Sequence, residues 1–278
     1  MQPLRYLGIA TAAAVIVFGA GVAFGAPGGA GSVPTAGREG PAGAAARMPD
    51  GRIATPPAVK YLPASASCPV PAYGPQFYAP GYRGYAKTVA LTFDDGPGKT
   101  TGRILRILRR FRAPATFFNI GQNMAARPAL LRKEKRYGFV LGNHTWSHPD
   151  LTTLTRRQQA AQIDEATAEQ RSITGTTPCV FRPPYGNYNA TTLSVARDHR
   201  LAVWLWSVDP EDWKADGSAS AYWVHRIIRL AETEGIQLQH PVIIMHNQPA
   251  GNPATALALP AIIRFFRHHH YRLVTLSG

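Results

Sequence analysis

Five short motifs that carry carboxylates, imidazoles and a guanidinium follow one another along this chain. Two adjacent carboxylates, Asp94 and Asp95, are followed by two imidazoles four residues apart, His144 and His148. One carboxylate with two imidazoles suits a catalytic zinc ion, because it fills three coordination positions and leaves the rest for water and substrate. The second carboxylate and a distant third imidazole, His246, are then available for proton transfer.

The remaining motifs are an Arg-Pro-Pro-Tyr-Gly segment that begins at Arg182 and an Asp-Pro-Glu-Asp-Trp segment that begins at Asp209. Each motif alone has an ordinary explanation. Asp, Gly and Pro favour turns, and a pair of histidines four residues apart without a glutamate is a weak metal signal. Their joint occurrence, each at the end of an expected strand, favours a metal site.

Seven β-rich runs alternate with helical patterns and predict the elements that hold these motifs. The strands are expected at 87–93, 115–120, 139–142, 179–182, 201–207, 242–246 and 271–276. The helices are expected at 101–112, 128–137, 155–175, 190–199, 220–234 and 254–269. Apolar residues at helical spacing, Pro128 in a first turn, a capping box from Thr155 to Gln158 and a stop at Gly175 support these helices.

The alternation of strands and helices predicts a parallel α/β domain, either a barrel or an open sheet. In such folds the functional site gathers at the carboxyl ends of the strands, which is where the five motifs lie. An open sheet would spread them along a line, whereas a barrel brings them into one cup. We therefore predict a barrel.

The first part of the chain has the composition of an export signal. The apolar run 7–24 is longer than the usual signal-peptide core of about 7–15 residues and approaches the ~20 residues that span a bilayer. Residues 1–26 are therefore expected to be a signal peptide or a membrane anchor. The Ala-, Gly- and Pro-rich residues 27–60 are expected to be a disordered linker, and residues 61–278 the catalytic domain.

Charge and cysteine content point to the envelope. The chain has 30 Lys and Arg against 16 Asp and Glu, a formal net charge of +14, which suits either general solubility or an anionic partner. No nucleic-acid motif is visible, so an anionic envelope polymer fits better than nucleic acid. The two cysteines, Cys68 and Cys179, most simply form one disulfide in an exported protein, the alternative being two unpaired thiols.

Taken together, the five motifs resemble those of the polysaccharide deacetylase family, carbohydrate esterase family 4, with its NodB homology domain. The resemblance covers about residues 87–277 and implies a distorted (β/α)7 barrel with a single catalytic domain. It also implies that Asp95, His144 and His148 bind one divalent ion. Zn²⁺ is the first choice for these ligands, with Co²⁺ or another divalent ion as alternatives.

The resemblance further implies how protons move. Asp94 matches the catalytic base, and Arg182 the residue that holds this base ionised. His246 matches the general acid that protonates the leaving amine, with Asp212 as the partner that keeps it charged.

The substrate contacts are implied in the same way. The backbone N–H of Tyr185 matches the donor to the oxyanion, and Trp213 and Ile244 match the apolar wall around the acetyl methyl group. The chain has Phe139-Val140 where the family often has His-Glu, and Asn247 where it often has Asp. We expect both departures near the cleft, with an effect on substrate preference.

The expected activity is removal of N-acetyl groups from a cell-envelope polysaccharide, most simply peptidoglycan N-acetylglucosamine. The alternatives are an O-acetyl esterase of the acetylxylan type, a chitooligosaccharide deacetylase and, from another class, a non-catalytic wall-binding domain. The complete set of candidate ligand and proton-transfer residues argues against the last. The remaining aromatic and imidazole residues are expected to be surface or packing positions: His225, His240, His268, His269, His270, Trp204 and Trp206.

Overall fold

The computed structural model describes residue 68 and residues 74–276, all of them within one compact unit, Pro56–Gly278. The expected export segment, residues 1–26, and the expected linker, residues 27–60, lie outside the described residues, so those two assignments stay predictions. In the part of the chain that is described, no helix is both long enough and apolar enough to cross a bilayer.

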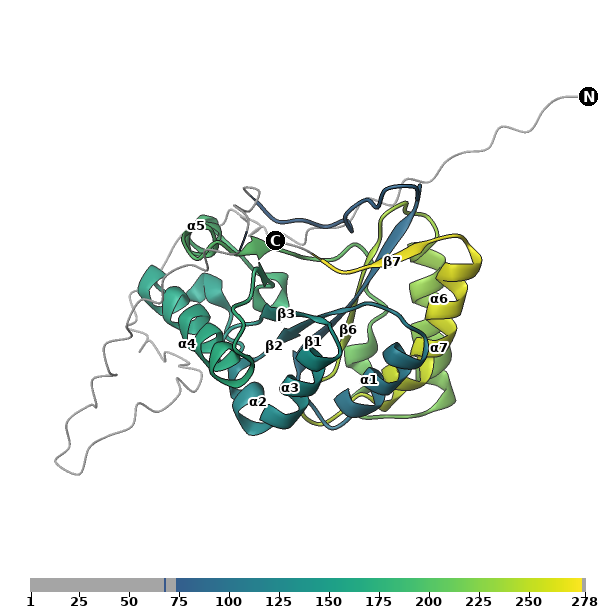
Figure 1. The fold of residues 1–278 in the computed structure, drawn as a ribbon, viewed down its shortest axis with the longest axis horizontal. Coiled ribbons are helices and arrows are strands. Elements are labelled where there is room, and N and C mark those ends of the chain that lie inside the picture. Colours follow the sequence, from purple (N-terminus) through teal and green to yellow (C-terminus); the bar gives the residue numbers. More distant parts are fainter. Residues whose placement is uncertain (1–67, 69–73, 277–278) are drawn as a thin grey trace, which may run out of the picture. The chain divides into compact units, whose positions relative to one another are not determined.

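Seven strands form one parallel sheet (Figure 1). They are β1 (Thr88–Gly96), β2 (Thr116–Asn119), β3 (Val140–Asn143), β4 (Val180–Phe181), β5 (Ala202–Val203), β6 (Val242–His246) and β7 (Arg272–Val274). Their order is β5-β4-β3-β2-β1-β6, and β7 pairs with the first residues of β1. Beyond β5, Val208 forms a parallel bridge to Ile243 of β6, so the sheet curls round and closes into the predicted distorted barrel.

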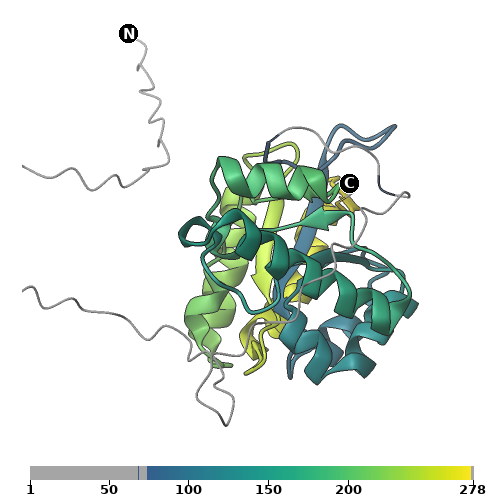
Figure 2. The same cartoon turned by 90° about the vertical axis from the view of Figure 1, so that its left-hand side faces the viewer.

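Helices cover the outside of this sheet (Figures 1 and 2). The described residues form α1 (Thr101–Arg110), α2 (Gly121–Ala126), α3 (Pro128–Arg136), α4 (Arg156–Thr174), α5 (Ala190–Asp198), α6 (Ala221–Gly235) and α7 (Pro253–His268). Short 3₁₀ turns are η1 (Leu151–Thr153), η2 (Pro184–Gly186) and η3 (Asp212–Ala215). Contacts run in an arc from α6 to α7, α1, α3, α4 and α5, so each helix packs against its neighbour as well as the sheet.

The local signals in the sequence locate several helix ends correctly. The Thr155 side chain accepts from the Gln158 N–H in a capping box, Gly175 ends α4 with φ 72°, and Pro128 opens α3. The short helix α2 was not predicted, because six residues without a side-chain cap show no helical period. The first strand also runs further than expected, to Gly96, so the paired aspartates lie within its end.

The strands turn alternate side chains to the helices and to the barrel interior, as the pleat requires. In β1, Val89, Leu91 and Phe93 join the apolar core beneath the helices. Ala90 instead belongs to a separate cluster inside the barrel, with Phe118, Val180, Ala202, Trp204 and Val242. By the same alternation Thr92 and Asp94 face inward. The interior therefore has an apolar lower part and a polar upper part at the carboxyl ends of the strands.

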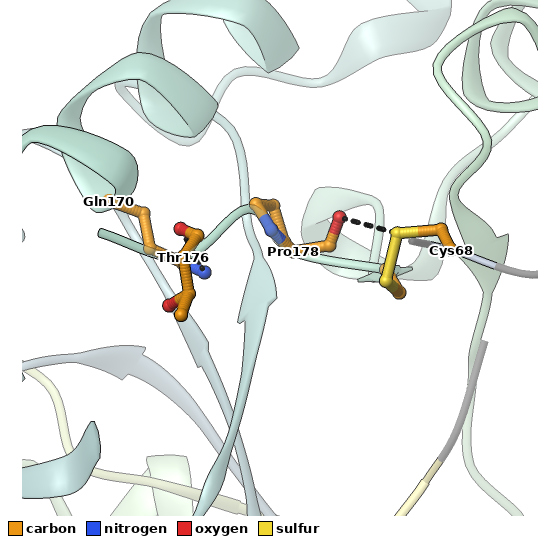
Figure 3. Close-up of a disulfide and its surroundings, with 5 residues drawn as sticks. Cys68, Gln170, Thr176 and Pro178 are labelled. Carbon is orange, nitrogen blue, oxygen red and sulfur yellow. Dashed lines mark hydrogen bonds between the residues drawn. A yellow bond between two sulfur atoms is a disulfide. The ribbon is translucent and has the colours of Figure 1, made fainter. Parts of the chain in front are cut away.

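Cys68 and Cys179 are joined in a disulfide across 111 positions of the sequence (Figure 3). Cys179 directly precedes β4, and the buried Sγ of Cys68 lies 3.5 Å from the carbonyl oxygen of Pro178. A disulfide sulfur has no proton to donate, so this is a packing contact. The bond ties the entry segment of the domain to the beginning of β4.

One buried carboxyl lies outside the site. Glu134 of α3 is fully buried, and its Oε2 accepts from Nδ2 of Asn119 at 2.7 Å. Its Oε1 and the Oδ1 of Asn119 have no hydrogen-bond partner. Burial raises the pKa of Glu134 to about 8 despite this bond. A protonated Glu134 supplies the missing donor, because its O–H can donate to the amide oxygen.

The first prediction concerns the disulfide. Replacing both cysteines by serine, in the variant Cys68→Ser/Cys179→Ser, should lower the free energy of unfolding by about 2–4 kcal/mol, because the unfolded chain loses a long closed loop. Urea unfolding with and without reductant measures the effect. Reductant should weaken the parent protein and leave the double variant unchanged; an unchanged parent would show that the bond contributes nothing.

The second prediction concerns Glu134. The pKa of Glu134 in the folded protein lies above the value of 4.5 for the free group. The protonated side chain therefore makes its whole contribution to stability below pH 4.5. This contribution is lost as the pH rises through about 8. In Glu134→Gln an amide replaces the acid and keeps a donor, so urea unfolding of this variant should depend less on pH and exceed the parent's stability at alkaline pH. Glu169→Gln is the matched control, because Glu169 is a half-buried carboxyl of α4. Parallel pH curves for parent and Glu134→Gln would exclude the protonated pair.

Candidate metal and catalytic site

A fully buried guanidinium lies at the centre of the site. Arg182, the residue after β4, donates to Asp94 Oδ1 at 2.7 Å and to Thr92 Oγ1 at 2.8 Å. Its other donors reach the carbonyl oxygens of Trp204 and Leu205 at 3.1 and 2.8 Å, and its plane lies 4.2 Å from the centre of the Phe118 ring. These acceptors fix the guanidinium in the barrel interior, and the guanidinium in turn fixes Oδ1 of Asp94.

Three ligand atoms meet above this pair. Oδ1 of Asp95 lies 3.4 Å from Nε2 of His144 and 3.3 Å from Nε2 of His148. Ligands 2.0–2.1 Å from a tetrahedral zinc ion are about 3.3–3.4 Å apart, so the spacing fits a shared ion. Oδ1 of Asp95 is also buried without a hydrogen-bond partner, as expected of an atom whose partner is a cation. Asp95, His144 and His148 therefore form a candidate metal site.

The first histidine is oriented by the residue beneath it. Nδ1 of His144 lies 2.7 Å from the carbonyl oxygen of Arg182, so Nδ1 carries the proton and donates. Nε2 is then unprotonated and faces Asp95. Such a bond from the distal nitrogen to a carbonyl is the usual way in which a metal-binding histidine is held in one tautomer. Arg182 thus supports the candidate base with its side chain and a candidate ligand with its backbone.

The electrostatics suit a metal site. Burial alone would raise the pKa of Asp95, but His144, His246 and His148 outweigh it and lower this pKa to about 2. Burial and the neighbouring His144 lower the pKa of His148 to about 4, so this imidazole is neutral at pH 7. An ionised carboxylate and a neutral imidazole are the forms that bind a metal ion.

A second buried pair stands on the neighbouring strand. Nδ1 of His246 donates to Oδ1 of Asp212 at 2.6 Å, and the His246 N–H donates to Oδ2 at 2.8 Å. Burial alone would lower the pKa of His246, but Asp212, with smaller contributions from Asp95 and Asp94, raises it to about 9. This imidazole is therefore protonated at neutral pH.

Two residues that the sequence did not single out hold this carboxylate in place. Nδ2 of Asn252 donates to Oδ2 of Asp212 at 3.2 Å, and the hydroxyl of Thr255 donates to the same oxygen at 2.5 Å. Both are fully buried and flank the start of α7. No sequence signal distinguishes them from ordinary helix-start residues, because their role depends on where α7 meets η3.

The site opens into a cavity of about 380 Å³. As expected, Tyr185, Trp213 and Ile244 line it together with the candidate metal and proton-transfer residues. Tyr185 is 64% exposed, has a left-handed backbone with φ 59°, and its ring lies edge-on to His148 at 4.6 Å. Trp213 is 49% exposed at the rim, whereas Ile244 is buried in the wall.

Two expectations about surrounding residues were wrong. Trp206, expected to be packing alone, also lines the cavity, as do Pro183 and Asp209. Phe139, expected near the cleft, instead packs against Phe117 in the outer core at 5.3 Å between ring centres. It stands at the amino-terminal end of β3, away from the ligands that follow the same strand.

The other departure from the family pattern also lies behind the site. Asn247 is fully buried, its N–H donates to the carbonyl oxygen of Asp94, and its Nδ2 donates to the Thr101 hydroxyl at 2.9 Å. A Cβ at Gly96 would lie within 2.6 Å of three atoms of the Asn247 amide, so only glycine fits between the aspartates and this side chain. Asn247 is not among the cavity-lining residues.

The remaining histidines and the Trp204 side chain do not line the cavity. Trp204 is buried in the barrel interior, and His240 is within 2.8 Å of the Thr88 hydroxyl at the opposite end of β1. His225 and His268 are exposed on α6 and α7. These positions agree with their expected surface or packing roles.

Comparison with known proteins identifies the family to which the chain belongs. The family model for polysaccharide deacetylases matches residues 82–204. The chain is 35% identical over 192 residues to the peptidoglycan-N-acetylmuramic acid deacetylase PdaC of Bacillus subtilis, a match that covers 69% of this chain and 38% of that protein. It is 34% identical over 192 residues to a peptidoglycan-N-acetylglucosamine deacetylase of Bacillus cereus, which covers 68% of this chain and 67% of the relative.

A solved structure gives the same result. The crystal structure of a peptidoglycan N-acetylglucosamine deacetylase in complex with an N-hydroxybenzamide compound superimposes with a TM-score of 0.65 at 32% identity. The match covers 72% of this chain and 89% of that one. The identity, the coverage and the shared fold together indicate common descent. The chain belongs to the polysaccharide deacetylase family.

Proposed function

We propose that this protein is an exported, metal-dependent deacetylase that hydrolyses the N-acetyl group of peptidoglycan N-acetylglucosamine. The observation that carries the proposal is the presence within one cavity of a carboxylate bound by a buried arginine, a protonated imidazole and a candidate metal-ligand set. Asp94 and His246 are direct neighbours in the register of β1 and β6, so base and acid face the same substrate.

Asp94 acts as the base. It takes a proton from water as the water oxygen bonds to the acetyl carbon. One of its oxygens is bound by Arg182, so the carboxylate stays oriented while the other oxygen accepts the proton. The backbone N–H of Tyr185 is the proposed donor to the oxygen of the tetrahedral intermediate.

His246 acts as the acid. When the carbon–nitrogen bond breaks, the proton on His246 passes to the leaving amine, which would otherwise depart as an unstable anion. Asp212 keeps that proton on the imidazole at neutral pH. Acetate and a free amino sugar are the products, and the proton gained by Asp94 balances the one lost by His246.

The metal is proposed to be Zn²⁺, since a carboxylate with two neutral imidazoles suits that ion. A divalent ion held by Asp95, His144 and His148 would polarise the acetyl carbonyl and lower the pKa of the attacking water. The residues present fit such an ion, because their ligand atoms converge and one of them lacks any other partner.

The proposed substrate and place of action follow from the named relatives, the N-terminal segments and the charge. Two of the compared relatives are named as peptidoglycan deacetylases, one for each sugar of that polymer. The apolar run 7–24 would deliver the domain outside the cytoplasmic membrane, and the segment 27–60 would let it reach the wall. The net charge of +14 favours an anionic polymer.

Acetate release tests the proposed function. Zinc-loaded protein is incubated with purified peptidoglycan, chitooligosaccharides and acetylxylan, and acetate is measured over time. Peptidoglycan should be the best substrate, and Asp94→Asn should lose about 10²–10⁴-fold in rate. Faster release from acetylxylan would move the assignment to an O-acetyl esterase, and no release from any of the three would favour a binding domain.

A metal-retention experiment tests the ligand set. His148→Ala removes one of three ligands, so elemental analysis after dialysis should find less than stoichiometric zinc, with activity lost in proportion. His225→Ala removes an exposed imidazole and should retain both metal and activity. Full zinc occupancy in His148→Ala would contradict the ligand assignment.

The pH dependence of the rate tests the acid. His246 must be protonated to act, and its raised pKa depends on Asp212, so the rate on the amide should fall on the alkaline side. Asp212→Asn removes that charge and should shift this fall to lower pH. The rate on an activated acetyl ester, whose leaving group needs no proton, should lose much less. An unshifted profile in Asp212→Asn would mean that another group supplies the proton.

A further inference from the structure

A second concave surface lies at the end of the barrel opposite to the catalytic site. It is built where parallel strands begin: Lys87 precedes β1, Pro114 lies just before β2, and Arg272 is the first residue of β7. The catalytic residue Asp94 stands seven positions beyond Lys87, about 23 Å away along an extended strand. Whatever binds here does not reach the metal ligands.

Two adjoining hollows make up this surface. One has a volume of about 430 Å³ and the other about 260 Å³. Both are lined by Tyr85, Arg267 and Tyr271, so they adjoin each other, and we call the two together the basal groove. Its walls come from the turn before β1, the end of α7 and the beginning of β7, elements that lie side by side (Figure 1).

The basal groove is lined by cations without carboxylates. Lys87, Arg112, Arg267 and Arg272 line it, and the residues that line the two hollows include no Asp or Glu. The three arginines are exposed, and none of the four forms an ion pair within the described part of the chain. Unlike these, Arg182 and Arg226 elsewhere in the domain each pair with a carboxylate. Neighbouring like charges repel, so such a cluster favours a bound anion.

Two exposed tyrosines lie in contact with each other at this end of the barrel, and one of them, Tyr85, lines the groove. Tyr82 and Tyr85 are 48% and 46% exposed and face each other across a tight turn, with ring centres 5.8 Å apart. The guanidinium of Arg272 lies 4.9 and 5.4 Å from the two ring centres. Exposed rings offer flat apolar faces with polar edges, which match the apolar faces and hydroxyl rim of a sugar. Guanidinium groups bind phosphate and carboxylate in a planar, two-bonded geometry.

We propose that the basal groove binds an anionic glycan, that is, a sugar polymer that carries phosphodiester or carboxylate groups. Such binding would hold the enzyme on the envelope while the site at the opposite end of the barrel deacetylates its substrate. The concave shape and the tyrosine pair favour a chain of sugars over a flat lipid surface. This site is separate from the deacetylation proposed above, and either can fail without the other.

The experiment measures binding of the full chain to defined polymers by isothermal titration calorimetry. The probes are a glycerol-phosphate teichoic acid for phosphodiesters, an oligogalacturonate for carboxylates and chitohexaose as the neutral glycan. The double variant Arg112→Gln/Arg272→Gln should bind the preferred anionic probe about tenfold more weakly or worse, because two charge-assisted contacts are lost. A rise in salt should weaken parent binding, as screening requires.

A matched control separates the site from the net charge. Arg103→Gln/Arg157→Gln removes the same charge from two exposed arginines of α1 and α4 and should leave affinity within twofold. Arg112→Glu, which leaves the Arg272–tyrosine stack intact, should also weaken binding and serves if the double variant is unstable. All variants should deacetylate a soluble chitooligosaccharide at the parental rate.

The outcomes are distinct. Stronger binding of teichoic acid identifies a phosphodiester ligand, and stronger binding of oligogalacturonate identifies a carboxylate ligand. Equal losses in the groove and control variants would overturn the proposal, since net charge alone would then explain binding. Equal affinity for chitohexaose and the anionic probes would overturn it as well.

Discussion

The buried ion pair between Arg182 and Asp94 is the constraint on which the rest of the site depends. A charged guanidinium inside a barrel loses its hydration, and that cost is offset only when its donors are all satisfied. Here the acceptors come from the end of β1, from the segment after β5 and from a threonine two residues before the base. The sheet must curl for these segments to face one another. The same residue then orients His144 through its carbonyl group, so barrel closure, base and metal ligand are coupled.

Two buried ion pairs, Arg182–Asp94 and Asp212–His246, involve the ends of the neighbouring strands β1 and β6. In one, the guanidinium of Arg182 binds the carboxylate of the proposed base; in the other, the carboxylate of Asp212 binds the imidazole of the proposed acid. The second pair is strong enough to overcome burial and raise the pKa of His246 to about 9. Separate environments thus surround the two groups that we propose as base and acid, a buried cation beside Asp94 and a buried carboxylate beside His246. Asn252 and Thr255 extend the arrangement by fixing the Asp212 carboxylate from α7.

Backbone conformation contributes as much as side-chain chemistry. Among the described residues, Asp95, Thr145, His148, Tyr185 and Glu211 all have positive φ without being glycine, and all lie within or beside the five motifs. Such conformations cost energy for residues with a Cβ and persist where surrounding contacts impose them. They turn the chain sharply at the strand ends, so that adjacent residues point in different directions. Asp94 consequently faces Arg182 while Asp95 faces the histidines.

The residue types and their order were enough to predict a parallel barrel and the convergence of the candidate metal-ligand and proton-transfer residues on one cavity, because strand ends in such folds converge. The ends of α4 at Thr155 and Gly175 could also be predicted, since the partners of these capping residues lie within one helical turn. Features that depend on contacts between distant segments could not be predicted from the sequence. Three such placements follow from how α7, β3 and the segment after β5 meet. Trp206 lies in the cavity wall, Phe139 lies in the outer core, and Asn252 and Thr255 lie behind Asp212. The cationic basal groove has the same origin, because its arginines are scattered along the sequence and only parallel strands that begin at one end of the barrel bring them together.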